Sequence, residues 1–581
     1  MSVLLSKDRR ALMPIVLPEK PTPQEKYAAT ELRYYLDLIT SAVFDVVHAG
    51  DNGIIIRHAD DSLSLGEDGF EIASDAEKIV IQGGKRGVIY GVYELLETLG
   101  VRFFTSTCEK VPSIVNLICP DIHTRQLPAF EHRDHNYYDL AQNGRFAVKS
   151  RLNGNSPEIK EQFGGHQKYT GFVHTFDRII PAKEFGETHP EYFAMYNGVR
   201  VARDDRTQLC LTNPDVLAIA KERVRKMLYA HPETRILSVS QNDHILGCQC
   251  EKCLAADKEE GSPAGTLLRF VNAIAEDLET EFPNVVFDTL AYNYTRPVPR
   301  ITKPRKNVCV RLCSIECCFS HPFETCTDDR SLTLPDGTKT SFINDLRNWG
   351  AYHDRLYIWD YTTCFAHYPT PHPNWRTLQI NMQAFHKNHV KGVFEQANGA
   401  KRGGVDFNEL RAYIITKLLW NPYTDVHKHI QEFTDYYYGD AGKYVRDYIN
   451  VLCDKAEKDN IHVGFNDQPV SELFSDEMLD MLDAIMDKAE EAVKGDALRL
   501  YRISKARLSV RWVRLKRHAM LKNELNPEEA TKFFTDWKAF GLSRIDEWVS
   551  AETTHRALLS NLWRGVEFYD HWINDEEREE F

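Results

Sequence analysis

The sequence of 581 residues contains no uninterrupted run of 18 apolar residues, so it predicts no membrane-spanning helix. It also lacks an excess of basic residues, because 71 Lys and Arg stand against 85 Asp and Glu, a formal net charge of −14. That charge disfavours nucleic acids and anionic membranes as partners, since their phosphates would be repelled. No short-period repeat or low-complexity tract is present. With 43% hydrophobic and 27% charged residues, the chain is expected to be globular rather than disordered.

Aromatic residues and cysteines are well represented. Aromatics make up 11% of the chain, which suits either a large core or a protein that stacks on flat apolar faces. The cysteines number 13, so they cannot all pair within the chain.

The order of strand-like and helix-like stretches predicts three regions. Residues 1–125 alternate short strands with two amphipathic helical stretches, which indicates a small α/β domain. Its Gly83-Gly84 turn lacks the complete pattern of a phosphate loop, so a turn before a helix is favoured. Residues 126–425 repeat strand and helix, which predicts a (β/α)8 TIM-like barrel. Residues 426–581 show few strand signals and predict a helical domain that buttresses the barrel.

Polar and aromatic residues end nearly every predicted strand of the middle region. They are Asn136 to Tyr138, Asn242-Asp243, Tyr292 to Tyr294, Glu316, Trp359 to Tyr361 and Glu395-Gln396. The carboxyl ends of barrel strands meet at one mouth, where the active sites of such enzymes lie. We therefore expect these side chains to surround one site.

Four carboxylates at these strand ends are candidates for proton transfer. Asn242 and Asp243 could divide the work, one orienting a substrate group and the other moving a proton. A helix cap or Asx-turn explains that pair equally well. Glu395, Asp360 and Glu316 could each be a structural ion pair, but four acids on four strand ends are typical of glycoside hydrolysis, which needs two carboxyl groups across a cleft.

Aromatic side chains would form the walls of such a site. The candidates for substrate contact are Tyr137, Tyr292, Tyr294, Trp359, Tyr361 and Trp375, together with His174 and Glu316. Flat rings with polar tips suit the apolar face of a sugar. Packing of strand aromatics against helices is the alternative, and for His174 a structural histidine is the alternative.

Eight of the cysteines lie between residues 248 and 326. A C-x-x-C knuckle and Cys pairs elsewhere can form a tetrahedral zinc site. Cys250, Cys253, Cys318 and Cys326 make one such set. Disulfides and free buried thiols are the other two possibilities. In each case the cysteines would brace loops at the barrel mouth, because nothing places a Cys–His catalytic pair.

Several long motifs resemble a known family: ILSVSQNDHILGCQCEKC, GSPAGTLLRFVNAIAEDLE, TLAYNYTR, RLCSIECCFSHPF, RLYIWDYTT and GVFEQ. Over about residues 130–420 they are similar to the domain of unknown function 4838 (DUF4838). Part of that group is classed as glycoside hydrolase family 163, endo-β-N-acetylglucosaminidases that act on N-glycans. Residues 1–125 resemble the small domain that precedes the barrel in family 20 hexosaminidases and family 67 α-glucuronidases.

The resemblance implies a retaining mechanism in which the 2-acetamido group of N-acetylglucosamine forms an oxazolinium ion. Family 20 places an Asp-Glu pair after its fourth strand, and the like position here holds Asn242 and Asp243. The resemblance therefore implies Asn242 as the orienting residue and Asp243 as the general acid/base. Asp has a shorter reach than Glu, so Glu395 is a rival for the acid and Asp360 a rival for the polarising group.

The expected substrate is a carbohydrate or glycoprotein, with no cofactor required beyond a possible structural zinc. Two alternatives stay open, an inverting enzyme like an α-glucuronidase and a carbohydrate-binding protein without catalysis. The chain start is not a convincing signal peptide, because KDRR interrupts its apolar residues. We expect export to the periplasm or cell surface with the signal absent from this sequence, while a cytoplasmic location and the oligomeric state stay open.

Overall fold

The computed structural model describes residues 2–202, 207–328, 332–333, 337, 339–522 and 525–559. Contacts divide the chain into two compact units. The first comprises 1–166, 407–446 and 487–503, and the second comprises 167–406, 447–486 and 504–581. Both units therefore draw on more than one predicted region, and the domain boundaries at residues 125 and 425 stay a prediction.

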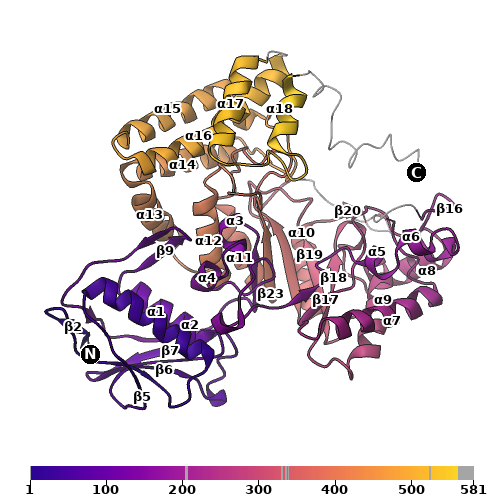
Figure 1. The fold of residues 1–581 in the computed structure, drawn as a ribbon. Helices are drawn as coiled ribbons and strands as arrows, with labels where there is room; N and C mark the ends of the chain where they lie inside the picture. Colours follow the sequence, from indigo (N-terminus) through magenta and orange to yellow (C-terminus); the bar gives the residue numbers. More distant parts are fainter. Residues whose placement is uncertain are drawn as a thin grey trace. The chain divides into compact units, whose positions relative to one another are not determined.

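The first unit is built on a mixed six-stranded sheet in the order β12-β7-β8-β6-β4-β5. The strands are β4 Ile15–Leu17, β5 Val46–His48, β6 Gly53–His58, β7 Phe70–Ser74, β8 Lys78–Gly83 and β12 His123–Gln126. Helices α1 (Pro23–Thr40) and α2 (Gly87–Thr98) pack together beside this sheet (Figure 1). Thr22 and Glu25 form a capping box that starts α1, with Pro23 in its first turn.

The Gly83-Gly84 turn is required by close packing. A Cβ atom on Gly84 would lie 1.8 Å from the main-chain oxygen of Gly66, and one on Gly87 would lie 1.9 Å from that of Gly69. Only glycine fits such an approach between two stretches of backbone. The turn thus joins β8 to α2 where the favoured sequence interpretation placed it.

A buried ion-pair network ties this sheet to the strand that follows it in the chain. Asp68 accepts from Arg86 Nε at 2.5 Å and from Arg133 Nη1 at 3.4 Å, and all three side chains are buried. Arg133 belongs to β13 (His132–His135). Burial alone would raise the pKa of the Asp68 carboxyl, but Arg133 and Arg86 hold it below its usual value.

The second unit contains a wholly parallel sheet with the order β14-β17-β18-β19-β22-β23. Its strands are β14 Tyr169–Thr170, β17 Ile236–Ser238, β18 Val286–Ala291, β19 Val308–Cys313, β22 Leu356–Tyr361 and β23 Val390–Gln396. Neighbours in the sheet follow one another in the chain, as successive β/α units of a barrel do. The mixed α/β class is confirmed, and within the described residues this unit forms six parallel strands of such a barrel.

Helices connect most of these strands. They are α7 Pro214–Ala230, α8 Glu251–Glu260, α9 Pro263–Leu278, α10 Phe342–Tyr352 and α11 Thr377–Lys387. The most strongly amphipathic of them buries Leu267, Val271 and Ile274 and exposes its opposite side, which is why α9 packs on α7 and on β18. Between β18 and β19 the described residues form only one helical element, the 3-10 turn Asn293–Thr295.

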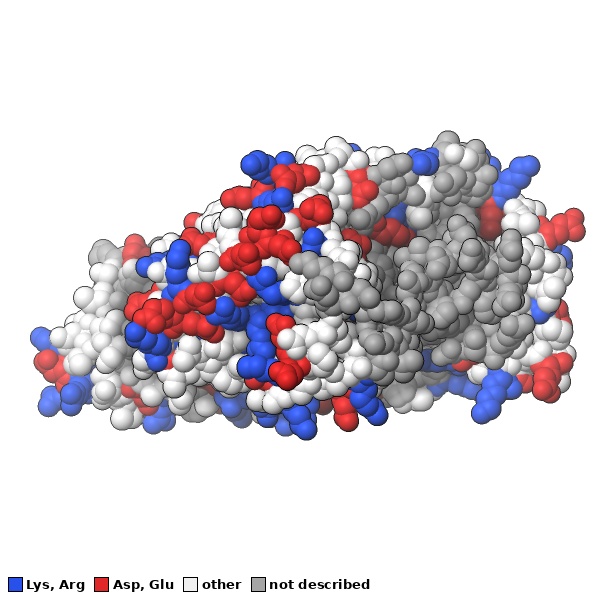
Figure 2. Space-filling view, turned by 90° about the horizontal axis from the view of Figure 1, so that it is seen from above, with Lys and Arg blue, Asp and Glu red and all other residues white. Residues whose placement is uncertain are grey.

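Four short helices, α3 Tyr138–Ala141, α4 Gly144–Lys149, α5 Phe176–Ile179 and α6 Ala182–Phe185, lie earlier in the chain. The longer helices after the last strand are α12 Asn408–Trp420, α13 Val426–Tyr437, α14 Gly442–Lys458, α15 Asp476–Ala492, α16 Ala497–Arg517, α17 Pro527–Ala539 and α18 Ala551–Leu559. The described part of the predicted helical region is therefore helical, and residues 560–581 lie outside it. None of the described helices is both long and apolar enough to cross a membrane. On the face seen in Figure 2, acidic and basic side chains lie intermixed.

We predict that Asp68→Asn destabilises the first unit by about 3–5 kcal/mol, because it removes the buried carboxylate that pairs with Arg133 and Arg86 and leaves Arg86 only the exposed Glu67 as a charged partner. The folded-state pKa of Asp68 is lowered, so its contribution is present above the unfolded-state pKa and is lost as the pH falls. Denaturant unfolding should therefore give a lower free energy of unfolding for the variant than for wild type at pH 7, and this difference should become smaller toward pH 3. The exposed carboxylate of Asp51 supplies the control variant Asp51→Asn, and an equal midpoint for Asp68→Asn would contradict the prediction.

Candidate active site

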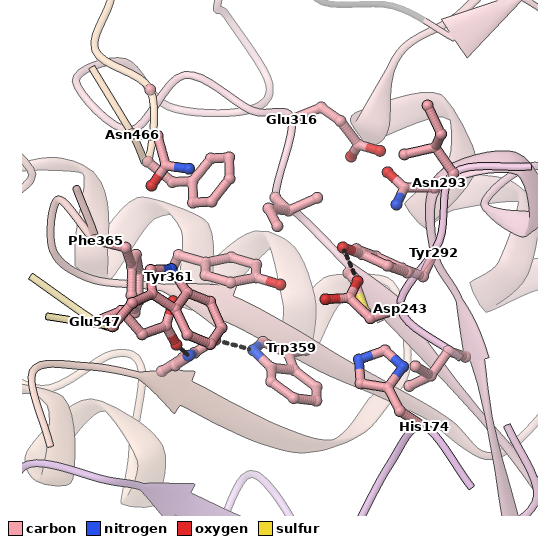
Figure 3. Close-up of a pocket in the computed structure, with 18 of the residues that line it drawn as sticks. His174, Asp243, Tyr292, Asn293, Glu316, Trp359, Tyr361, Phe365, Asn466 and Glu547 are labelled. Carbon is pink, nitrogen blue, oxygen red and sulfur yellow. Dashed lines mark hydrogen bonds between the residues drawn. The ribbon is translucent and has the colours of Figure 1, made fainter. Parts of the chain in front are cut away.

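A cavity of about 560 Å³ opens at the carboxyl ends of the parallel strands in the second unit (Figure 3). Its lining residues are His174, Asp243, Ile245, Leu290, Tyr292, Asn293, Cys313, Ile315, Glu316, Trp359, Tyr361, Phe365, Gln396, Gly464 to Asp467, Glu547 and Trp548. Strands β18, β19, β22 and β23, or the residues directly after them, supply nine of these 19 residues. The strand ends thus surround one cavity, where catalytic residues of barrel enzymes lie.

Strand alternation decides which side chains reach the cavity. Trp359 and Tyr361 are two residues apart on β22, so they share a face of the sheet, and Gln396 pairs with Tyr361 on the neighbouring strand. All three line the cavity. Asp360 and Glu395 pair with each other in the same register and therefore lie on the opposite face. They do not line this cavity.

Asp360 and Glu395 form a buried carboxyl pair. Asp360 accepts from the Ser314 hydroxyl at 2.5 Å and from the Tyr361 main-chain N–H at 2.9 Å. Burial raises the pKa of both groups, and the charge of Asp360 raises that of Glu395 further. The raised pKa values favour the protonated, uncharged form of these carboxyl groups, which lie on the sheet face opposite the one that lines the cavity.

Asp243 stands in the cavity on the segment that follows β17. The Tyr292 hydroxyl donates to Asp243 Oδ1 at 3.0 Å (Figure 3). Burial, and then the charge of Asp243, hold the pKa of Tyr292 well above its usual value, so this hydroxyl keeps its proton and acts as a donor. The carboxylate and the phenol together can hold a polar group of a substrate.

Asn242 is buried beside Asp243 but does not line the cavity. Its side-chain oxygen accepts from the Asp177 main-chain N–H at 3.0 Å, and its nitrogen donates to the Thr207 main-chain oxygen at 2.6 Å. Both ends of the amide are therefore occupied by backbone groups. Asn242 is placed to fix the segment that presents Asp243, and its amide has no edge turned to a substrate in the cavity.

Glu547 is a cavity carboxylate that the sequence patterns did not indicate. Gln396 Nε2 donates to it at 2.9 Å, and Gln396 Oε1 accepts from Trp359 Nε1 at 2.9 Å (Figure 3). The Glu547 main-chain N–H donates to the Phe365 oxygen at 3.0 Å, which pins it to the loop after β22. Glu547 follows no predicted strand, so the rule that found the other acids could not find it.

The environment of Glu547 keeps it partly protonated near neutral pH. Burial raises its pKa to about 7, with a further upward contribution from the charge of Asp243 and a downward one from the hydrogen bond of Gln396. A carboxyl group with that pKa can give a proton at neutral pH. Asp243 and Glu547 are thus two cavity acids, and the charge of Asp243 contributes to the raised pKa of Glu547.

Two further carboxylates line the cavity. Glu316 accepts from Arg296 Nη1 at 3.1 Å, and Arg296 Nε in turn donates to Asp345 at 2.7 Å. Asp467 accepts from the Gly464 main-chain N–H at 2.7 Å within its own turn. The buried Arg296 keeps Glu316 beside the cavity, where its carboxylate can accept from hydroxyl groups.

The other predicted contact residues are placed differently. His174 lines the cavity and donates from Nδ1 to the Gln241 main-chain oxygen at 2.8 Å. Tyr294 and Trp375 do not line it, and Tyr294 packs on Gly247, where a Cβ atom would come within 2.7 Å of its ring. Tyr137 belongs to the first unit, where its ring contacts His135.

The four predicted zinc ligands fall into two groups among the described residues. Cys250 and Cys253 lie with Cys210 and Cys248, whereas Cys318 and Cys326 lie with His321 and His462. The predicted set of four therefore does not form one site. Each predicted pair instead lies beside two other potential ligands that were not in the predicted set.

Comparison with known families places this chain. The domain of unknown function DUF4838 matches residues 103–450, more than half of the chain, so the protein belongs to that family. The resemblance to this family is confirmed, and membership of glycoside hydrolase family 163 stays a prediction. No curated protein matches the chain.

Solved structures resemble the chain at low sequence identity. A family GH115 4-O-methyl-α-glucuronidase, BtGH115A, with specificity for decorated arabinogalactans, is 13% identical with a TM-score of 0.56, over 92% of this chain and 76% of that one. The GH20 β-N-acetylhexosaminidase from Streptomyces coelicolor is 12% identical with a TM-score of 0.41, over 76% and 92%. CpGH89 from Clostridium perfringens is 11% identical with a TM-score of 0.47, over 88% and 65%. The first likeness shows a shared fold.

We predict that Asp243→Asn lowers the pKa of Glu547, because it removes a negative charge that raises it. Carbodiimide labels protonated carboxyl groups, so the pH dependence of Glu547 labelling, quantified by peptide mass spectrometry, reports this pKa. The Glu547 labelling curve should move to lower pH in Asp243→Asn. Glu316→Gln is the matched control, since Glu316 is not among the charges that act on Glu547. An unchanged curve in Asp243→Asn would refute the coupling.

Proposed function

We propose that this protein is a glycoside hydrolase whose reaction is carried by Asp243 and Glu547. The observation that supports the proposal is the pair itself: two carboxyl groups in one aromatic-walled cavity, of which Glu547 has its pKa raised to about 7. Glycoside hydrolysis requires an acid that protonates the leaving oxygen and a second carboxylate with a different task. The rings of Trp359 and Tyr361 suit stacking on a sugar face.

The particular activity we propose is that of an endo-β-N-acetylglucosaminidase acting on N-glycans. Glu547 gives its proton to the glycosidic oxygen while the carbonyl oxygen of the 2-acetamido group attacks the anomeric carbon. Asp243 accepts from the acetamide N–H and stabilises the positive charge of the oxazolinium ion that forms. Glu547 then takes a proton from the water that opens this ring, so the anomeric configuration is retained. Asn242, the orienting residue implied by the family resemblance, holds the backbone segment that presents Asp243.

A second candidate is an inverting α-glucuronidase, which the shared fold with the GH115 4-O-methyl-α-glucuronidase favours. In that reaction the same two side chains act, with Glu547 as the acid and Asp243 as the base for a water molecule. Inverting enzymes keep their carboxyl groups about 6.5–9.5 Å apart to admit that water. Glu316, which lines the cavity and is held there by the buried Arg296, would then contact the sugar hydroxyl groups.

Product analysis separates the two candidates. We expect N-glycoproteins treated with the enzyme to lose their glycans and keep a single N-acetylglucosamine on each asparagine, as detected by mass spectrometry. Arabinogalactan decorated with 4-O-methylglucuronic acid is the parallel substrate. Release of the uronic acid alone would replace the first candidate with the second. Glycan binding without turnover of either substrate would refute both and leave a carbohydrate-binding protein.

Variant kinetics test the roles of the two acids. We predict that Glu547→Gln and Asp243→Asn each lower kcat by ~10²-fold or more, because each removes a group that acts in the transition state. Glu552→Gln changes an exposed carboxylate nearby in the chain and serves as the control. Glu395→Gln and Asp360→Asn test the sequence-based rivals on the far face of the sheet. Loss of turnover in those two with full turnover in Glu547→Gln would overturn our assignment.

A further inference from the structure

Four cysteine sulfur atoms from two distant segments converge in the second unit. Cys248, Cys250 and Cys253 follow the segment that carries Asp243, and Cys210 approaches them from the segment before α7. Cys210 Sγ lies 3.7 Å from Cys250 Sγ and 3.9 Å from Cys253 Sγ, and all four sulfur atoms lie within 4.8 Å of one another. All four side chains are buried. We call these residues the four-cysteine group.

The spacings in the four-cysteine group are those of a metal tetrahedron. Zinc binds thiolate sulfur at about 2.3 Å, so the edge between two sulfur ligands of a tetrahedral site is about 3.8 Å. A disulfide would instead bring two sulfur atoms to about 2.05 Å. Four sulfur atoms that lie within 4.8 Å of one another, with two of the separations at 3.7 and 3.9 Å, match an all-thiolate zinc site in number and size.

The surroundings of the four-cysteine group favour thiolates. Cys248 Sγ accepts from the Met195 main-chain N–H at 3.4 Å and from Arg200 Nη1 at 3.5 Å. Cys250 is the N-cap of α8, and Cys253 lies in its first turn. A helix N-terminus and N–H donors both stabilise negative charge on sulfur. Such outer hydrogen bonds accompany metal-bound thiolates.

A second group, the cysteine–histidine group, combines two residues of each type. Cys318, His321 and Cys326 follow β19, and His462 follows α14. His321 Nδ1 lies 3.4 Å from Cys318 Sγ, and His462 Nδ1 lies 3.3 Å from Cys318 Sγ and 3.6 Å from Cys326 Sγ. With zinc bound to nitrogen at about 2.0–2.1 Å and sulfur at about 2.3 Å, the mixed tetrahedral edge is about 3.6 Å.

The histidine rings of the cysteine–histidine group are oriented for binding. Both present Nδ1 to the sulfur atoms, and His462 Nε2 lies 3.2 Å from the Asn460 side-chain amide, which fixes its ring. A partner on the second ring nitrogen is typical of metal-bound histidine. Sulfur and imidazole ligands in tetrahedral arrangement select zinc among the common cellular cations.

We propose that the chain binds two structural zinc ions, one at Cys210, Cys248, Cys250 and Cys253 and one at Cys318, His321, Cys326 and His462. Each set provides four protein ligands, which is the mark of a structural site, since catalytic zinc keeps one position open. The described residues contain no other such group of three or more. This inference is independent of the proposed glycosidase activity.

The two sites hold walls of the cavity. The four-cysteine group clamps the segment that presents Asp243 and Ile245, three to five residues before Cys248. The cysteine–histidine group joins the loop of Glu316, two residues before Cys318, to the segment Gly464 to Asp467, which begins two residues after His462. Zinc therefore fixes long loops whose backbone has few strand or helix hydrogen bonds of its own.

Metal analysis of the full-length protein, purified without chelators, is the first test. We expect two equivalents of zinc per chain by plasma mass spectrometry and 13 titratable thiols after denaturation without reductant. The double variant Cys250→Ser/Cys253→Ser should retain one equivalent, and Cys326→Ser/His462→Gln should retain the other. Cys453→Ser, a buried cysteine outside both groups, should retain two. Metal-free wild type, or fewer thiols because disulfides have formed, would overturn the proposal.

Cobalt substitution of the wild-type protein covers the case in which a variant fails to fold. The absorption intensity of thiolate-to-cobalt charge transfer grows with the number of sulfur ligands. The four-cysteine group, with four sulfur ligands, should therefore contribute about twice the intensity of the cysteine–histidine group, which has two. Hydrogen exchange then tests the bracing role: extraction of zinc should raise exchange at residues 243–253 and 463–467. Unchanged exchange there, with the metal removed, would refute that role.

Discussion

The period-two alternation of side chains along the parallel strands governs the candidate site. On β22 it turns Trp359 and Tyr361 to the cavity and Asp360 away from it, and the register with β23 does the same for Gln396 and Glu395. The cavity wall is consequently aromatic and amide in character along these strands. Its carboxylates come from segments beyond the strand ends, so the chemistry depends on how those segments are held.

Different contacts position the two cavity acids, Asp243 and Glu547. Asp243 is fixed by the buried amide of Asn242, whose two ends bond to backbone, and by the Tyr292 hydroxyl. Glu547 is fixed by main-chain pairing with the loop after β22 and by the hydrogen-bond chain from Trp359 through Gln396. In both cases the carboxyl group is positioned by partners that carry no net charge. Burial and the charge of Asp243 raise the pKa of Glu547, and the hydrogen bond from Gln396 lowers it.

Strand ends could be found from the sequence because each is an apolar run followed by polar residues, and this pattern located Asp243, Tyr292, Glu316, Trp359 and Tyr361 at the cavity. The same pattern could not tell Asp360 from Trp359, since a position in the run does not reveal which face it takes. Gln396 ends the last strand, and Glu547 lies 151 residues further along the chain, in a region whose sequence pattern predicts helices. Only tertiary pairing with the loop after β22 brings it to the cavity.

The cysteines show the same limit at longer range. Spacing identified Cys250 and Cys253, and also Cys318 and Cys326, as ligand pairs, but a tetrahedral site needs partners that the fold supplies. Cys210 lies 40 residues before Cys250, and His462 lies 144 residues after Cys318. Each distant partner closes a loop that ends near a cavity carboxylate. The proposed metal ligands and the cavity carboxylates therefore lie on the same loops.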